Sequence, residues 1–163
     1  MSAGNIVAVI DYGMGNLRSV SKALEHVAGN KQVIVTADPA VVAAAERVVF
    51  PGQGAMPDCM RELDARGLRP AVLAAAKEKP FLGICIGLQM LFDHSEEGDF
   101  AGLGVFAGDV KRFPETKMFG ADGQRLKVPH MGWNNVAHKA HALWANIDED
   151  ARFYFVHSYC VQP

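Results

Sequence analysis

The stretch from Pro80 to Phe92, which reads PFLGICIGLQMLF, constrains the fold of this chain more than any other. Its first half, Phe81 to Ile84, has the apolar character of a short buried strand, and we predict a helix over Leu88–Phe92. Cys85 lies between them in the pattern G-x-C-x-G. A strand, a sharp turn that carries a nucleophile between glycines, and a helix together make a nucleophile elbow.

Cys85 has two interpretations. In an elbow its sulfur lies near a helix N-terminus, whose N–H groups and dipole favour the thiolate. Alternatively it is a buried structural residue, because free cysteine is among the most buried residue types. This stretch alone does not separate the two.

The first half of the chain alternates between strands and helices. We predict strands over Ile6–Ile10, Val33–Val35, Arg47–Phe50 and Phe81–Ile84, with helices from Leu17, from Pro39, over Pro57–Ala65 and over Arg69–Lys79. This order predicts an α/β fold, in which a mainly parallel open sheet has helices on both faces. Ligands of such sheets bind at the carboxyl ends of the strands. The loops that begin at Asp11, Pro51 and Cys85 share that edge, which favours the nucleophile.

The second half is less regular. We predict a polar loop over residues 94–98, a strand over Asp109–Phe113, an exposed hairpin or loop over Pro114–Gln124, a short helix over Ala142–Ile147 and a last strand over Arg152–Val156. Repeats, low-complexity segments and linkers are absent from the sequence, so we expect one domain over residues 1–163.

Composition restricts the function classes. Hydrophobic residues make up 50% and charged residues 21%, as in a soluble globular protein, and a net charge of −2 does not favour a nucleic-acid or membrane surface. The sequence has no apolar run as long as a membrane span and no signal-peptide pattern. The cysteines at 59, 85 and 160 lack zinc-site spacing, so we expect reduced thiols in the cytoplasm and no metal site.

A cysteine nucleophile needs a base or orienting group and donors for an oxyanion. An elbow offers the N–H of Ile86, and the loop of Gly52 and Gly54 offers another if it turns a peptide inward. Gln89, one helical turn beyond the cysteine, lies on the same face, and Glu96 follows the helix. Taken alone, the two are also explained as an exposed helix residue and a solvated loop acid.

Together these residues resemble a known family. Pro51-Gly52-x-Gly54 and Gly83-Ile84-Cys85-x-Gly87-x-Gln89, with the α/β order, resemble the class I, triad-type glutamine amidotransferases, which have a flavodoxin-like sheet. Residues 11–20, 95–98, 129–134 and 153–159 are similar, more narrowly, to the glutaminase subunits of imidazole glycerol phosphate synthase, an enzyme of histidine biosynthesis. The resemblance covers nearly the whole chain.

The resemblance implies hydrolysis of glutamine to glutamate and ammonia, without a cofactor. Cys85 would attack the side-chain amide and form a glutamyl thioester that water opens. Carried over by position, Gly52, Gly54 and the N–H of Ile86 would serve the oxyanion and the substrate amide. The α-amino and α-carboxylate groups would be held by Gln89, Glu96 and the backbone around Ser158 and Tyr159.

The resemblance also implies a partner. In the family, ammonia passes to a (β/α)8-barrel cyclase subunit that makes imidazole glycerol phosphate and AICAR, so the expected assembly is a cytoplasmic heterodimer. Asn16, Met131 and Trp133 would contact that barrel. Core packing is the alternative for Met131 and Trp133, since isolated aromatic residues and methionines usually lie in cores.

One part of the family pattern has no match. The family's general base is a histidine, followed two residues later by a glutamate near the C-terminus, and this sequence lacks that pair. His157 matches a family position near the substrate that is not the base, while His130 and His94 match non-catalytic positions. We therefore expect a domain that is incomplete at its C-terminus, and little glutaminase turnover by this chain alone, because loss of a triad member costs several orders of magnitude.

Three alternatives remain open. The first is the glutaminase subunit of pyridoxal phosphate synthase, which has the same chemistry and another barrel partner; the segment Pro129-His130-Met131-Gly132-Trp133-Asn134 disfavours it. The second is a non-catalytic interaction module of the same fold. The third is a cysteine hydrolase of the same broad architecture that uses another histidine.

Overall fold

The computed structural model describes residues 5–120 and 123–163. The chain divides into two compact units, which are described separately below. Unit 1 runs to Lys111 and includes Val161–Pro163, and unit 2 is Arg112–Cys160. One domain over residues 1–163 remains a prediction.

The centre of unit 1 is a parallel sheet of four strands. The strands are β1 (Ile6–Ile10), β2 (Gln32–Thr36), β3 (Arg47–Gly52) and β4 (Phe81–Cys85), in the order β2-β1-β3-β4. All three neighbouring pairs are parallel. Every residue of β1 is buried, as expected for a continuous apolar run in a central strand. The sequence prediction of these four strands and of their parallel arrangement is confirmed.

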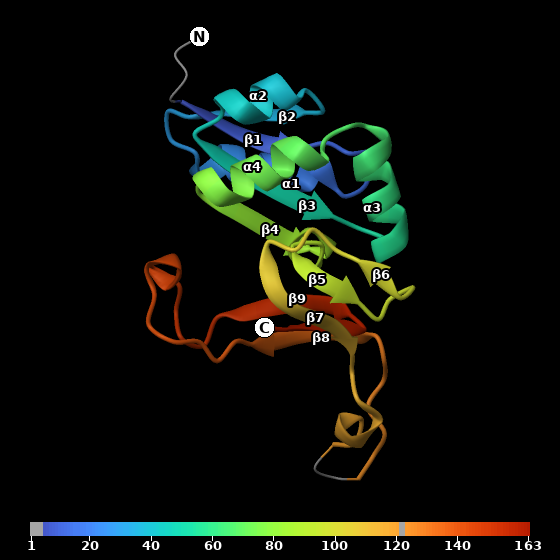
Figure 1. Ribbon diagram of the computed structural model, residues 1–163. Helices are drawn as coiled ribbons and strands as arrows, with labels where there is room; N and C mark the ends of the chain where they lie inside the picture. Colours follow the sequence, from blue (N-terminus) through green and yellow to red (C-terminus); the bar gives the residue numbers. More distant parts are fainter. Residues whose placement is uncertain (1–4, 121–122) are drawn as a thin grey trace. The chain divides into compact units, whose positions relative to one another are not determined.

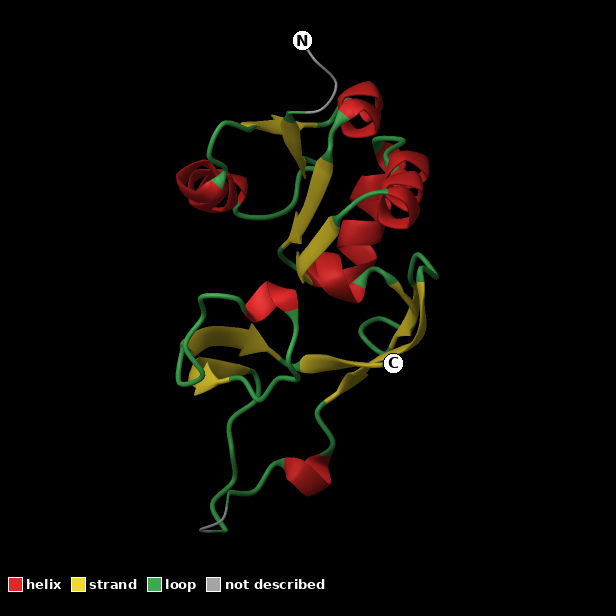
Figure 2. Ribbon diagram, turned by 90° about the vertical axis from the view of Figure 1, so that its left-hand side faces the viewer, coloured by secondary structure: helices red, strands yellow, loops and turns green. Residues whose placement is uncertain are grey.

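Helices cover both faces of this sheet (Figures 1 and 2). They are α1 (Leu17–Val27), α2 (Pro39–Ala44), α3 (Met56–Ala65) and α4 (Arg69–Glu78). Apolar residues of α1 pack on Val7, Val9 and Val49, and those of the other three helices pack on the opposite face, with Ile10 and Phe50. The predicted α/β class is confirmed.

The short helix after β4 differs from the prediction of a helix over Leu88–Phe92. Helix α5 is Ile86–Gln89, and strand β5 (Phe92–Ser95) begins soon after it. Met90, Leu91 and Phe92 are all buried. A short run of apolar residues cannot be assigned to helix or strand from periodicity alone, which is why the prediction was wrong here.

Strand β5 belongs to a second sheet, of order β10-β7-β5-β6. The other strands are β6 (Phe100–Ala101), β7 (Phe106–Arg112) and β10 (Tyr159–Gln162). β5 pairs with β7 in parallel and with β6 antiparallel. The predicted strand over Asp109–Phe113 is β7, which begins three residues earlier, and part of the predicted polar loop over residues 94–98 lies in β5. The sequence analysis did not predict β10.

Unit 2 contains a two-stranded antiparallel sheet of β8 (His130–Asn135) and β9 (Arg152–His157), whose register runs from His130↔His157 to Asn135↔Arg152. β9 was predicted, but β8 was not, because its glycine and asparagines have low strand propensity. The predicted helix over Ala142–Ile147 is only a 3₁₀ turn, Ala142–Trp144. Within the predicted hairpin or loop over Pro114–Gln124 lies another 3₁₀ turn, Glu115–Lys117; residues 121–122 are outside the described part.

Candidate active site

Cys85 occupies the turn between β4 and α5. It is the last residue of the strand and the N-cap of the helix, and its backbone has φ 57° and ψ −120°. A residue other than glycine rarely adopts a positive φ, and such strain is typical of functional positions. The residue is exposed, so the alternative of a buried structural cysteine is wrong. The strand, turn and helix have the arrangement of an elbow.

The glycines on either side of the cysteine are required by close packing. A methyl group on Gly83 would lie 2.7 Å from the Cα of Leu88 and 2.9 Å from the carbonyl oxygen of Gly87. A methyl group on Gly87 would collide with the carbonyl oxygen of Phe50 in β3. Helix α5 therefore begins almost in contact with the strands below it, which leaves the cysteine at the tip of the turn.

Gly52 lies directly beside the elbow. It is the partner of Cys85 in the parallel register of β3 and β4. A methyl group on Gly52 would lie 2.9 Å from the backbone N of Gly87 and would collide with the hydroxyl of Tyr12. Gly54 has a φ of 116°, a conformation that favours glycine. The loop after β3 and the first turn of α5 thus present their peptides at the same place.

Cys59 holds the Gly52–Gly54 loop through a hydrogen bond. Its Sγ lies in helix α3, fully buried, and donates a hydrogen bond to the carbonyl oxygen of Gln53 at 3.6 Å. Burial raises the pKa of the Cys59 thiol, so the sulfur keeps the proton that it donates. Burial likewise raises the pKa of Tyr12, which lies against Gly52. The sequence analysis assigned no role to these two residues.

Gln89 is buried in the structure. Only 7% of the residue is exposed, so the alternative of an ordinary exposed helix residue is wrong. Its Oε1 atom accepts no hydrogen bond from the residues that the structure describes. A buried acceptor without a donor costs roughly 1–3 kcal/mol, which favours a donor arriving from outside the chain.

Glu96 follows β5 and is exposed. Its backbone N–H donates to the carbonyl oxygen of Val110 at 2.9 Å, which continues the pairing of β5 with β7. The next residue, Glu97, reaches the start of helix α3, where its carboxylate accepts a hydrogen bond from Met56. Sequence reasoning did not find this contact, since nothing in the sequence links two residues 41 positions apart.

Asn16, in unit 1, caps helix α1. Its Oδ1 accepts a hydrogen bond from the backbone N–H of Ser19 at 3.2 Å, as is typical of an asparagine before a helix. The residue is also exposed. Six further predicted site residues lie in the same unit: Gly52, Gly54, Cys85, Ile86, Gln89 and Glu96.

The other predicted residues lie in unit 2. Met131 and Trp133 in β8 are 62% and 59% exposed, so the core-packing alternative is wrong for both. Across the hairpin they pair with Val156 and Tyr154, which are also exposed, and the four side chains form an apolar face. The carbonyl oxygen of Ser158 accepts from Phe113, and that of Tyr159 lies 2.9 Å from Nδ1 of His157.

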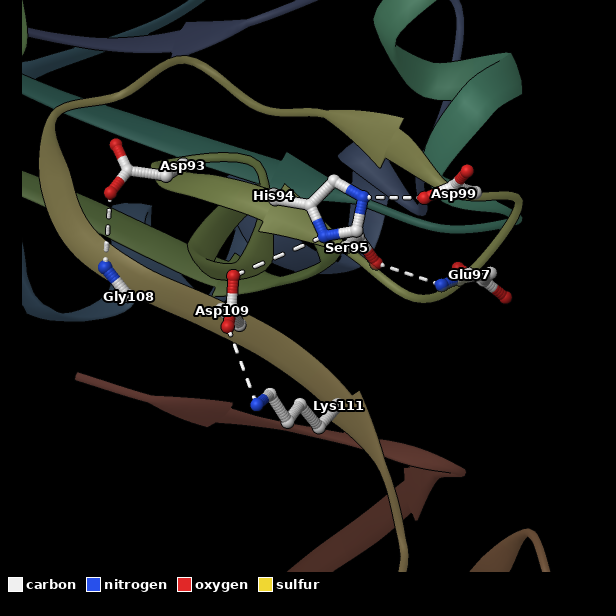
Figure 3. A network of polar contacts seen from close by, with 8 residues as sticks. All are labelled: Asp93, His94, Ser95, Glu97, Asp99, Gly108, Asp109 and Lys111. Atoms are coloured by element: carbon white, nitrogen blue, oxygen red, sulfur yellow. Dashed lines mark hydrogen bonds and ion pairs between the residues drawn. The ribbon is translucent and has the colours of Figure 1, made fainter.

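No histidine of unit 1 bonds to the thiol of Cys85 in the described part of the chain. His26 is in the last turn of α1. His94 places Nε2 2.9 Å from Asp99 and Nδ1 3.9 Å from Asp109, within the polar network of Figure 3. The elbow thus combines an exposed thiol with peptides on two sides, an arrangement suited to attack on an amide carbonyl.

Two absences hold for residues 5–120 and 123–163. Three or more metal-binding side chains do not come together there in a way that could hold an ion. None of the helices in that part of the chain has the length and hydrophobicity needed to cross a membrane.

Comparisons with known proteins find one matching family and several similar relatives. The family described as "Glutamine amidotransferase class-I" matches residues 8–163. A protein named "Imidazole glycerol phosphate synthase subunit HisH" from Dechloromonas aromatica (strain RCB) is 79% identical over 161 residues, which are 99% of this chain and 75% of that protein. The protein of the same name from Aromatoleum aromaticum is 71% identical over 158 residues, 96% of this chain and 74% of that protein.

A solved structure described as "Crystal structure of glutamine amidotransferase" has the same fold. Its TM-score is 0.52 at 20% sequence identity, and the match covers 65% of this chain and 56% of the other. At this level of identity the likeness concerns the fold alone.

Proposed function

We propose a function from the premise that this chain belongs to the class I glutamine amidotransferase family, whose match extends over residues 8–163. The proposed reaction is the hydrolysis of glutamine to glutamate and ammonia, in a glutaminase subunit of imidazole glycerol phosphate synthase. The relatives named above carry that subunit's name, not that of a pyridoxal phosphate synthase. The observation that carries the proposal is the backbone of Cys85, at φ 57° and ψ −120°.

In the proposed reaction the Cys85 thiolate adds to the side-chain amide carbon of glutamine. The oxyanion accepts hydrogen bonds from the N–H of Ile86, at the start of α5, and from a peptide of the Gly52–Gly54 loop. Collapse of the intermediate breaks the C–N bond; the leaving nitrogen takes up the proton that the thiol lost on forming the thiolate, departs as ammonia and leaves a glutamyl thioester. Water then opens the thioester to glutamate and restores the thiol.

In unit 1, the substrate's α-amino and α-carboxylate groups are assigned to Gln89 and Glu96. The buried Oε1 of Gln89 supports this assignment. It accepts no hydrogen bond from the described residues, and an ammonium group is a strong hydrogen-bond donor. The exposed carboxylate of Glu96 is suited to the same cation.

We further propose that ammonia passes to a (β/α)8-barrel cyclase subunit in the cytoplasm. The exposed apolar face of β8 and β9, with Met131 and Trp133, supports a protein contact, and Asn16 is assigned to it as well. The free thiols of Cys59, Cys85 and Cys160 support a reducing compartment.

The proposed turnover of this chain alone is low. The family's His-x-Glu pair has no match in this sequence, and a nucleophile without its base loses several orders of magnitude in rate. Release of glutamate at the rate of an intact triad enzyme would contradict this expectation.

A glutamine-analogue label tests the function independently of turnover. We expect 6-diazo-5-oxonorleucine to modify Cys85, as measured by mass spectrometry of peptides, with excess glutamine protecting it. Cys85→Ser should abolish the modification, and Cys160→Ser, the matched control, should leave it unchanged. A Cys85 thiol that reacts with iodoacetamide and ignores the analogue would favour the non-catalytic interaction module.

A further inference from the structure

Helix α3 begins without a cap from its own segment. Its N-cap residue is Ala55, which has no side-chain acceptor. The acceptor comes instead from Glu97, whose Oε2 atom lies 2.9 Å from the backbone N of Met56, the first residue of the helix. A carboxylate at this position accepts a hydrogen bond from one of the free N–H groups at the start of the helix, and its negative charge complements the helix dipole.

The loop that carries Glu97 is fixed at two further points. The backbone N–H of Glu97 donates to Oγ of Ser95 at 3.1 Å, and Ser95 is completely buried (Figure 3). The Cα of Gly98 lies so close to Pro57, the second residue of α3, that a methyl group there would collide with the proline ring. The loop is therefore held against the first turn of α3 by both a charged hydrogen bond and packing.

The same turn of α3 is joined to the loop after β3. Ala55 and Met56 follow the Gly52–Gly54 loop directly in the chain. Cys59, one turn into the helix, donates to the carbonyl oxygen of Gln53. The first turn of α3 thus connects the loop of Glu96 on one side with the loop of the proposed oxyanion donors on the other.

We propose that Glu97 is a positioning residue for glutamine binding, which fixes the loop of Glu96 relative to the Gly52–Gly54 loop through the first turn of α3. The inference rests on the proposed function, because it takes Glu96 as a contact of the substrate's α-amino group. Glu97 itself does not contact the substrate; it fixes the position of Glu96.

Two substitutions at Glu97 separate positioning from charge. Glu97→Gln keeps a side-chain oxygen that can accept a hydrogen bond from Met56. Glu97→Ala removes this oxygen together with the side chain that extends to the helix. Asp58→Asn is the matched control, since it removes a carboxylate from the first turn of the same helix but not from the loop. The readout is the modification of Cys85 by 6-diazo-5-oxonorleucine over a range of concentrations, which gives the half-saturating concentration and the saturating rate separately.

We expect Glu97→Ala to raise the half-saturating concentration about tenfold, the effect of losing a charged hydrogen bond, and to change the saturating rate less than about twofold. Glu97→Gln and Asp58→Asn should stay within about twofold of the wild type in both, since neither removes the hydrogen bond between loop and helix. Iodoacetamide, which lacks the α-amino and α-carboxylate groups, should modify Cys85 in all four proteins at the same rate.

Three results would overturn the inference. One is a Glu97→Ala protein with unchanged half-saturation; another is a Glu97→Gln protein as impaired as Glu97→Ala; the third is a loss of reactivity toward iodoacetamide that matches the loss toward the analogue. If Glu97→Ala fails to fold, Glu97→Asp, whose shorter side chain draws back from Met56, takes its place with the same expected shift. A wild-type chain that reacts with iodoacetamide but not with the analogue marks failure of the proposed function itself.

Discussion

The elbow at Cys85 and the first turn of α3 at Cys59 each place a thiol in unit 1, under opposite conditions. Cys85 is exposed, at the start of a helix and in a strained backbone conformation. Cys59 is buried within a helix, and its sulfur donates to a peptide of the neighbouring loop. Chain geometry therefore decides which thiol can act as a nucleophile, because the sulfur of Cys85 is exposed, whereas the sulfur of Cys59 is buried and donates a hydrogen bond.

The largest expected difference between the two regions is in chemical reactivity. Iodoacetamide should modify Cys85 roughly a thousandfold faster than Cys59 or more, because Cys59 reacts only when its surroundings open. Peptide mass spectrometry after timed quenching measures both rates in one sample, and added urea should raise only the rate of Cys59. Comparable rates in the native protein would remove the distinction.

The elbow should also be the less tolerant region of the two to added volume. Gly87→Ala places a methyl group on the carbonyl oxygen of Phe50, and we expect it to lower the free energy of unfolding by at least about 3 kcal/mol. Gly132→Ala in β8 is the matched control, since a methyl group there meets no atom within 4 Å. Urea unfolding measures both, and equal stability of the two variants would contradict the close packing described for α5.

Relief of backbone strain should have a smaller effect of opposite sign. Cys85→Gly removes a strain of roughly 1–3 kcal/mol at φ 57° and adds about 0.5–1 kcal/mol of unfolded-state entropy, so we expect a net stabilisation of about 1 kcal/mol. Cys85→Ala, which keeps the β-carbon, should not show this gain. If the glycine and alanine variants unfold at the same urea concentration, the cysteine is not strained.

The smallest effect expected is a loss of stability at alkaline pH that comes from the region of Cys59. Burial raises the pKa of Cys59 and of Tyr12 above the unfolded values of about 8.5 and 10. Between the unfolded and folded pKa values the folded chain binds more protons, so this stability is complete below about pH 8 and is lost as the pH rises. Urea unfolding at several pH values measures it, and Cys59→Ala should reduce the slope near pH 9; an unchanged slope would contradict the assignment.

The sequence predicts the sheet of unit 1 and the elbow because both depend on local patterns. Apolar runs such as Ile6–Ile10 are long enough to identify a buried strand. The pattern G-x-C-x-G identifies a tight turn, because glycine has no side chain to collide with the neighbouring backbone. The helix was predicted two residues too late, because the apolar residues Met90 and Leu91 pack in the core and do not belong to the apolar face of a helix. β8 was missed because its pairing with β9, not its own propensity, makes it a strand.

The residues that support the site could not be predicted in the same way. Tyr12, Cys59 and Glu97 act through partners that are distant in sequence or that only the fold brings near, as Glu97 does with Met56. Glu96 and Glu97 are adjacent in the sequence, and nothing in the sequence indicates that one is exposed and the other bonds to the start of α3. Met131 and Trp133 were ambiguous for a similar reason, because composition does not say whether an apolar residue is covered.

The sheet order β2-β1-β3-β4 has a consequence for the handling of this protein. The strand that carries Cys85 is the last in that sheet of the described residues, so one side of its backbone has no strand beside it there. An outer strand of this kind pairs readily with another polypeptide. Any self-association that begins at this strand would extend hydrogen bonding along Phe81–Cys85 and bring a foreign chain to the sulfur. Such pairing would lower the accessibility of the Cys85 thiol.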